Sequence, residues 1–389
     1  MALLSTLSQR AMAQTVALSD DPNFISASLL IAFPGPVLPQ APGHAFIRMQ
    51  CPEQNLDQIF TFENNGDNNF FIRFIEGADG RVMEFDYSDY MPQFVEEGRQ
   101  VNSYSLNLSL NEKARLWEVL DSLKTLPPRS FDVIRSHCFS EIAVSIEIAI
   151  RPARVMWDSG SLQTNTYAEN MIHMAGEKSP WHVFLLQIPI TEILDKKDSG
   201  RRFVYPTIFA ETYSDFIIED PDGSTRPLVI GEPEILLPDN NPSLSKPVHP
   251  TPIEAAFILF VIVVIVTALQ AWRGWKLPGV ILDSLLWTLA IVGGLFIAIV
   301  SYIQMHSVAN LTMIVLNPLA WLPLILCRYR ARARHWIWIA YTVILVLFAV
   351  AIPLVSPGIS APWRILAATL AIRSLFHALN SSKRNIAER

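Results

Sequence analysis

The side chain best suited to covalent chemistry is the thiol of Cys138, because the residues that follow it have the composition of a buried helix. A cysteine at a helix N-terminus meets the positive end of the helix dipole and free N–H groups, which favour the thiolate. The alternative is a small buried residue that only fills space. Cys138 is therefore a candidate nucleophile, and such a nucleophile also needs a base.

His44 is the preferred candidate for that base. It opens a strand-like segment, His44–Cys51, directly after a Pro-Gly pair, where a backbone can approach another element closely. His137 precedes Cys138, and neighbouring side chains on a helix point about 100° apart. A lone histidine at a strand start is more often structural, which is the alternative for His44.

Cys51 is a second thiol in the same part of the chain. It is an odd number of residues away from His44, so on a regular strand the two side chains face opposite sides. We interpret Cys51 as structural. A disulfide between Cys51 and Cys138 is the competing arrangement outside the cytoplasm, and it would abolish a thiolate at Cys138. The cysteine spacing does not fit a zinc site, so no metal is expected.

The elements that would hold these side chains predict an α+β domain, with a small antiparallel sheet packed on helices. Alternating apolar residues predict further strands after the one at His44; they cover Asp57–Phe62, Phe70–Ile75 and Val82–Tyr87. Helical spacing or a dense apolar composition predicts two helices, over Asn111–Leu123 and Phe131–Ile150.

The composition indicates a membrane protein, because only 17% of its 389 residues are charged, against about 25% in soluble proteins. A net charge of -6 argues against nucleic-acid binding. The apolar excess follows Pro252 as five stretches, each near the ~20 residues that span a bilayer. They are Ile253–Ala271, Pro278–Tyr302, Val308–Cys327, Trp336–Val355 and Ser360–Leu379.

Basic residues follow the first, third and fifth stretches, which predicts that these three ends are cytoplasmic. The large N-terminal domain then lies outside the cytoplasm, and the C-terminus is cytoplasmic. The fifth stretch is the weakest, because Arg364 and Arg373 interrupt it, and an interfacial amphipathic helix is the alternative.

Three polar positions in the membrane half are candidates for function. Asp283 falls inside the second stretch, where carboxylates are costly and often functional. His306 lies on the short outward loop, and Asn317 precedes a proline that breaks the third stretch. The alternative for Asp283 is a position at a solvated helix end. The alternative for His306 and Asn317 is that they only satisfy the backbone groups freed at the kink.

These observations predict five regions along the chain. Residues 1–23 read as a residual signal or leader and 24–237 as the exported domain. Residues 238–252 form a Pro-rich linker, 253–380 the transmembrane domain, and 381–389 a cytoplasmic tail.

The segment Gly43–Arg48 resembles the Gly-His-x-x-x-Arg strand of the Lnb-type lipoprotein N-acyltransferase family, which is related to permuted papain-like (NlpC/P60-like) thiol enzymes. The resemblance covers roughly residues 24–380. Further segments that resemble the family are Asn69–Gly77, Leu106–Leu120, Phe131–Cys138, Thr166-Tyr167, Pro180-Trp181, Leu282-Asp283 and His306–Leu324. The chain departs from the family pattern at His137 and Phe139, which flank the thiol, and at Pro42.

The resemblance implies a permuted papain-like domain in the periplasm, followed by five transmembrane helices in the bacterial inner membrane. It implies a Cys-dependent N-acyltransferase with Cys138 as nucleophile and His44 as base, and no metal or soluble cofactor. The third catalytic group is sought among Thr61, Glu63 and Asn64. Residues with substrate-binding or supporting roles are Arg48, His137, His306, Asn317 and Asp283.

The expected partners are a lipoprotein N-terminus, which accepts a fatty acyl group, and membrane lipid. Two other functions stay open. One is a periplasmic cell-wall amidase or peptidase that uses the same thiol and base. The other is a membrane-anchored scaffold with the same fold and no catalysis.

Overall fold

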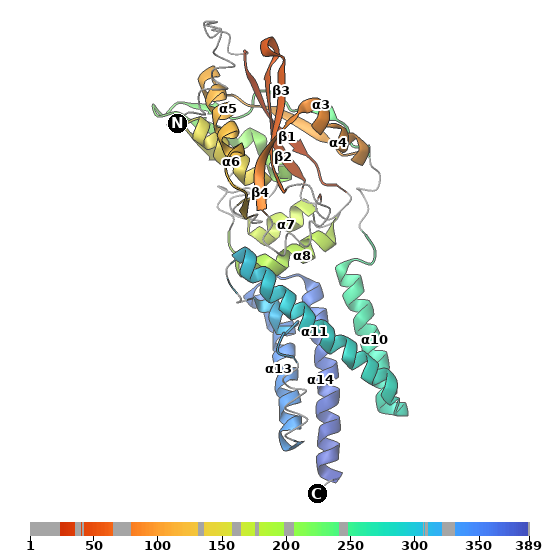
Figure 1. The fold of residues 1–389 in the computed structure, drawn as a ribbon. Coiled ribbons are helices and arrows are strands. Elements are labelled where there is room, and N and C mark those ends of the chain that lie inside the picture. The colour runs from red at the N-terminus through yellow and green to blue at the C-terminus, as the bar shows by residue number, and fades with distance from the viewer. Residues whose placement is uncertain are drawn as a thin grey trace. The chain divides into compact units, whose positions relative to one another are not determined.

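The computed structural model describes residues 24–35, 40, 43–64, 79–130, 136–157, 165–175, 179–197, 206–240, 248–305, 307, 310–320 and 331–387. The chain forms two compact units (Figure 1). The first combines Met1–Thr164 with Asp198–Lys246, and the second combines Asn165–Lys197 with Pro247–Arg389. Residues 165–197, which the sequence analysis places within the exported domain, therefore group with the C-terminal helices.

The first unit is built on an antiparallel sheet of seven strands in the order β10-β5-β1-β2-β3-β4-β6. These strands are β1 Ser26–Ala32, β2 His44–Cys51, β3 Leu56–Asn64, β4 Asp79–Asp86, β5 Val101–Ser105, β6 Arg129–Ser130 and β10 Glu234–Leu237. A second sheet pairs β7 Arg154–Trp157, β8 Phe216–Glu219 and β9 Thr225–Pro227 in that order. The unit is sheet-rich as expected, whereas the permuted papain-like topology stays a prediction. The expected strand at Phe70–Ile75 lies outside the described residues.

Helices cover both faces of the larger sheet, because its central strands bury apolar side chains on both sides. On one face the ring of Phe46 stacks on that of Phe94 from α4, with 5.3 Å between centroids. On the other face Phe60 packs edge-on against Trp117 of α5 at 6.0 Å. The helices are α3 Tyr87–Tyr90 and α4 Pro92–Glu97 on the first face, and α5 Leu110–Lys124 and α6 Cys138–Ala149 on the second (Figure 1).

The start of α6 matters most for the site, because its first residue is Cys138. His137 is the N-cap residue in an extended conformation, and its backbone N–H donates to the Ser140 hydroxyl at 2.9 Å. The first intrahelical bond runs from the Glu141 N–H to the His137 carbonyl. The backbone N–H groups that come before that of Glu141 in α6 therefore have no carbonyl acceptor within the helix. The remaining short elements of this unit are η2 Pro52–Gln54, α9 Pro206–Thr212 and η5 Tyr213–Asp215.

The second unit is helical and contains three helices that are long and apolar enough to cross a membrane, among the described residues. These candidate spans are Pro252–Arg273, Lys276–Ile303 and Arg334–Val355. The helices of this unit are α7 Tyr167–Ala175, α8 Pro180–Ile190, α10 Pro252–Arg273, α11 Lys276–Met305, α13 Ala331–Val355 and α14 Ala361–Ala387, with η4 Thr191–Ile193 and η7 Leu311–Ile314.

The prediction of five spans is therefore wrong for the part of the chain that the structure describes. The third stretch, Val308–Cys327, shows only η7 and turns over residues 310–320, and its remaining residues lie outside the described part. The fifth stretch lies in α14, which is a long helix but carries arginines at positions 364 and 373. Charges of this kind keep α14 below the apolar threshold of a typical span.

Polar contacts explain why residues 165–197 belong with the helices. The Asp195 carboxylate accepts the backbone N–H of Gly358 at 2.7 Å, in the turn between α13 and α14. The Gln187 side chain accepts the N–H of Ser360 in the same turn at 3.1 Å. The ring of Phe184 stacks on that of Trp363, with 5.0 Å between centroids. This segment therefore caps the α13–α14 connection within its own unit.

Candidate functional site

The thiol of Cys138 and the ring of His44 lie together at the end of the larger sheet. His44 is the first residue of β2 and Cys138 is the first residue of α6. A hydrogen bond and opposite charges connect the two side chains. Residues from two distant parts of the chain thus form one pair, within a single unit.

The pair is a thiolate and an imidazolium. Burial alone would raise the pKa of Cys138, but the charge of His44 and hydrogen bonds from His137 and His44 outweigh burial and lower it to about 5. Burial would likewise lower the pKa of His44, but the Cys138 thiolate and the Glu63 carboxylate raise it to about 10. Near neutral pH the sulfur is therefore ionised and the ring is protonated.

No disulfide competes with this pair, because Cys51 and Cys138 are both free thiols. Cys51 is buried at the end of β2, and burial raises the pKa of its thiol. A buried thiol with a raised pKa is poorly reactive. The two sulfurs in this unit thus differ in ionisation, and only that of Cys138 is activated.

Glu63 is the acidic partner of His44. The β2–β3 register pairs Phe46 with Thr61. Two residues further along each of these antiparallel strands, His44 and Glu63 therefore lie opposite each other on the same face. His44 Nε2 lies 2.8 Å from the Thr61 hydroxyl and 3.2 Å from Glu63 Oε1. Because Nε2 faces these oxygens, Nδ1 is the ring nitrogen left for the sulfur.

The Glu63 carboxylate is itself held by two further donors. Its Oε1 accepts the Thr61 hydroxyl at 3.1 Å and the hydroxyl of Tyr90 from α3. Burial opposes ionisation of Glu63, but the hydrogen bond and charge of His44 and the hydrogen bonds of Tyr90 and Thr61 lower its pKa. Burial and the Glu63 charge raise the pKa of Tyr90 well above its usual value, so the phenol stays a donor.

A tight turn brings His44 to its position. Gly43 has φ = +79°, and a Cβ there would lie 2.9 Å from the backbone oxygen of Ala32. Glycine accepts a positive φ without a steric penalty, and it has no Cβ to collide with β1. The strand start predicted after the Pro-Gly pair thus has a backbone reason.

The other candidates in this unit lie apart from the thiol chemistry or outside the described atoms. Arg48 shares a face with His44 but binds the Asp57 carboxylate with two hydrogen bonds of 2.8 and 2.6 Å. Its guanidinium also lies 3.5 Å from the centroid of the Tyr87 ring. Asn64 ends β3, and its side chain lies outside the described residues. No sequence pattern pointed to Tyr90, which precedes the turn between the short helices α3 and α4.

In the helical unit, Asp283 is engaged by the arginine that interrupts the fifth stretch. Arg373 is fully buried, and its Nε and Nη2 donate to the two Asp283 oxygens at 2.8 and 2.7 Å. Its Nη1 donates to Thr267 and Gln270, and His377 Nε2 lies 3.0 Å from the Asp283 carboxylate. The arginine joins α10, α11 and α14 as a neutralised buried pair.

The structure describes only one of the other two candidate residues of the membrane half. Asn317 Oδ1 accepts the backbone N–H of Leu319 at 2.8 Å, which stabilises a local turn. His306 lies outside the described residues. Nothing in the described part of the chain groups three or more metal-ligating side chains.

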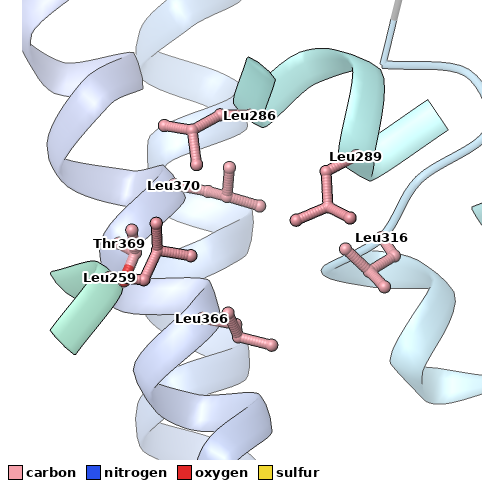
Figure 2. A pocket seen from close by; sticks show the side chains of 7 residues that line it. All are labelled: Leu259, Leu286, Leu289, Leu316, Leu366, Thr369 and Leu370. Carbon is pink, nitrogen blue, oxygen red and sulfur yellow. The ribbon is translucent and has the colours of Figure 1, made fainter. Parts of the chain in front are cut away.

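The helical unit also contains an apolar pocket, shown in Figure 2. Its lining residues are Leu259, Leu286, Leu289, Leu316, Leu366, Thr369 and Leu370. The Thr369 hydroxyl donates to the carbonyl of Ile365, so the lining provides apolar contact and no free reactive group. The thiol pair of the first unit is therefore better suited to covalent chemistry than this pocket.

Comparison with known families identifies the C-terminal part of the chain. Residues 244–385 match the family model of the Lnb transmembrane domain. No curated protein and no solved structure matches the chain. The predicted family resemblance is thereby supported in the membrane half, where residues 244–385 are similar to the Lnb transmembrane domain.

Proposed function

We propose that this protein is a membrane-bound acyltransferase that moves a fatty acyl group from an ester, through a thioester on Cys138, to the N-terminal amine of lipoproteins. The observation that carries the proposal is the Cys138 thiolate paired with the His44 imidazolium. The Lnb transmembrane domain supports a substrate that is itself held in a membrane.

The reaction follows from the charges of the pair. The thiolate attacks the ester carbonyl, and the carbonyl electrons move to its oxygen. When the carbon–oxygen bond of the ester breaks, the leaving alcohol takes its proton from His44. The neutral imidazole then removes a proton from the incoming amine, which attacks the thioester, forms the amide and releases the thiolate.

Glu63, Thr61 and Tyr90 act on His44 in this scheme. Glu63 stabilises the imidazolium and fixes the ring plane, because its Oε1 lies near Nε2 while Nδ1 faces the sulfur. Tyr90 and Thr61 hold the carboxylate as hydrogen-bond donors. We assign these residues to positioning, and we assign proton transfer to His44 alone.

The distribution of basic residues supports an inner-membrane location with the first unit in the periplasm and the C-terminus in the cytoplasm. Lipoprotein N-termini carry their lipid in the membrane, so an anchored enzyme meets them at high local concentration. A cell-wall amidase would use the same pair, but nothing in its reaction calls for an Lnb transmembrane domain.

The direct test compares lipoprotein N-termini, by mass spectrometry, from cells whose only N-acyltransferase is this protein. Cys138→Ala is expected to leave the α-amine free, and Cys51→Ala, which removes the inert thiol, is the matched control and is expected to preserve N-acylation. Unchanged acylation with Cys138→Ala contradicts the proposal. Release of cell-wall peptides by the purified protein, with no effect on lipoproteins, favours the amidase instead.

A further inference from the structure

The end of the sheet around His44 holds several buried polar atoms that lack a partner among the described residues of the first unit. Native proteins satisfy nearly all such atoms, so each exception needs an explanation, and a waiting ligand is one of them. The atoms are Gln40 Oε1, Arg81 Nε, Arg99 Nη2, His137 Nε2 and Thr207 Oγ1.

These atoms come from different elements, and other atoms of several of these residues lie near the start of β2 or pair with the next strands. The Thr207 methyl lies 3.7 Å from the position of a Cβ on Gly43, directly before His44. The Gln40 carbonyl accepts the Gly43 N–H at 3.0 Å. Arg99 Nε donates to the carbonyl of Phe33, which follows β1 beside the start of β2. Arg81 pairs with Glu63 in the β3–β4 register.

His137 stands out among them because it directly precedes the nucleophile. Its side chain is 4% exposed, and Nε2 is the nitrogen without a partner. The capping box at the start of α6 has the His137 side chain accepting the Ser140 backbone N–H, so the other nitrogen carries the proton. The His137 side chain also hydrogen-bonds the Cys138 sulfur, so its ring lies beside the atom that would attack a carbonyl group.

We propose that His137 is a catalytic residue whose Nε2–H, together with the Cys138 backbone N–H, binds the carbonyl oxygen of the substrate's acyl ester and stabilises the oxyanion. This inference rests on the proposed function and adds the donor that the scheme lacks.

The electron balance is that of the acylation step. The sulfur–carbon bond forms as the carbonyl electron pair moves onto oxygen, where two N–H donors receive the charge. The pair returns when the carbon–oxygen bond to the alcohol breaks, and the alcohol takes its proton from His44. A donor that stabilises the charged oxygen lowers the barrier, in addition to the part that His137 plays in lowering the pKa of Cys138.

Two reagents separate this role from a structural one. Iodoacetamide alkylates the thiolate by direct displacement and forms no oxyanion, whereas p-nitrophenyl butyrate acylates it through a tetrahedral intermediate. Both reactions are measured on the full-length protein in detergent micelles, in a background where Cys51 and Cys327 are replaced by Ala. The variants are His137→Ala, His137→Asn, which keeps a side-chain N–H, and the exposed control His173→Ala.

His137→Ala is expected to slow the burst of p-nitrophenol by about 10²–10³-fold, while alkylation above pH 8, where the thiol is ionised, changes by less than about threefold. His137→Asn is expected to regain most of the burst rate, and His173→Ala to match the parent. An equal loss of alkylation and acylation, or an unchanged burst in His137→Ala, overturns the oxyanion role. A Cys138-independent burst in the parent protein refutes the proposed function itself.

Discussion

The charge on His44 should set the pH at which Cys138 becomes reactive, and replacing His44 with Ala removes that charge. In the native protein the thiol ionises with a pKa of about 5, so the thiolate is present above this pH and disappears as the pH falls through it. Without the imidazolium, burial still raises the pKa of Cys138 and only His137 still lowers it. The pH at which half of the thiol is reactive should therefore rise by up to about four units.

The size of this shift follows from the structure. A change from 9.0 to about 5 corresponds to about 5 kcal/mol, at about 1.4 kcal/mol for each unit. His137 contributes part of the lowering, so the His44 share is smaller than the whole. An exposed ion pair contributes less than about 1 kcal/mol. A pKa shift of several units on removal of His44 would therefore indicate a buried ion pair.

The assay is the rate of iodoacetamide alkylation between about pH 4 and 10, in the Cys51→Ala, Cys327→Ala background. The midpoint is the informative quantity, because a thiolate of higher pKa is intrinsically more nucleophilic and the plateau rates partly compensate. His44→Ala is expected to show a midpoint well above 5 that approaches 9, because only the contribution of His137 remains. Arg48→Ala, on the same strand but bound to Asp57, is the matched control and should keep the native midpoint.

One result would refute the reasoning. If native protein and His44→Ala share a midpoint near 9, the imidazolium does not activate the sulfur and the ion pair is absent in solution. A midpoint near 5 in both proteins would mean that the N-terminus of α6 and His137, and not His44, lower the pKa of Cys138.

Three further predictions concern the supports of the site and of the helical unit. Glu63→Gln should lower the pKa of His44 from about 10, so the alkaline limit of acyl transfer should move to lower pH in a rate profile; an unmoved limit contradicts the role of Glu63. Asp283→Asn should lower the free energy of unfolding by about 3–5 kcal/mol, because Arg373 is left buried without a counter-charge; thermal unfolding in micelles measures this, and the paired change to two leucines should recover most of it. Gly43→Ala should lose at least about 1 kcal/mol more than Gly231→Ala, since both glycines have positive φ but only Gly43 meets a neighbouring backbone; equal losses would exclude the close approach as the cause.

Much of the thiol site could be predicted from local sequence. A cysteine before a dense apolar segment marks a helix start, and a Pro-Gly pair before alternating residues marks a strand start. The β2–β3 register then selects Glu63 from the candidates on the next strand. Tyr90 could not be found in this way, because its place beside Glu63 depends on how α3 folds back over the sheet.

The membrane half shows a different limit. A hydropathy pattern reflects the charges along the chain, but it does not indicate whether a charged side chain has a partner inside the folded protein. Arg373 therefore weakens the predicted fifth span even though Asp283 neutralises it. The third stretch fails for a local reason, since its described part forms a short 3₁₀ helix and a turn held by Asn317.

Residues 165–197 interrupt the first unit in sequence but belong to the second unit, which has a practical consequence for the design of fragments of this protein. The polypeptide passes between the units three times, so no single truncation site yields the thiol-bearing half alone. A fragment that stops before Pro247 would keep α7 and α8 without the turn that Asp195 and Gln187 cap, and Phe184 would lose the Trp363 ring on which it stacks. A soluble version of the thiol-bearing half would have to excise that insertion and join Thr164 to Asp198.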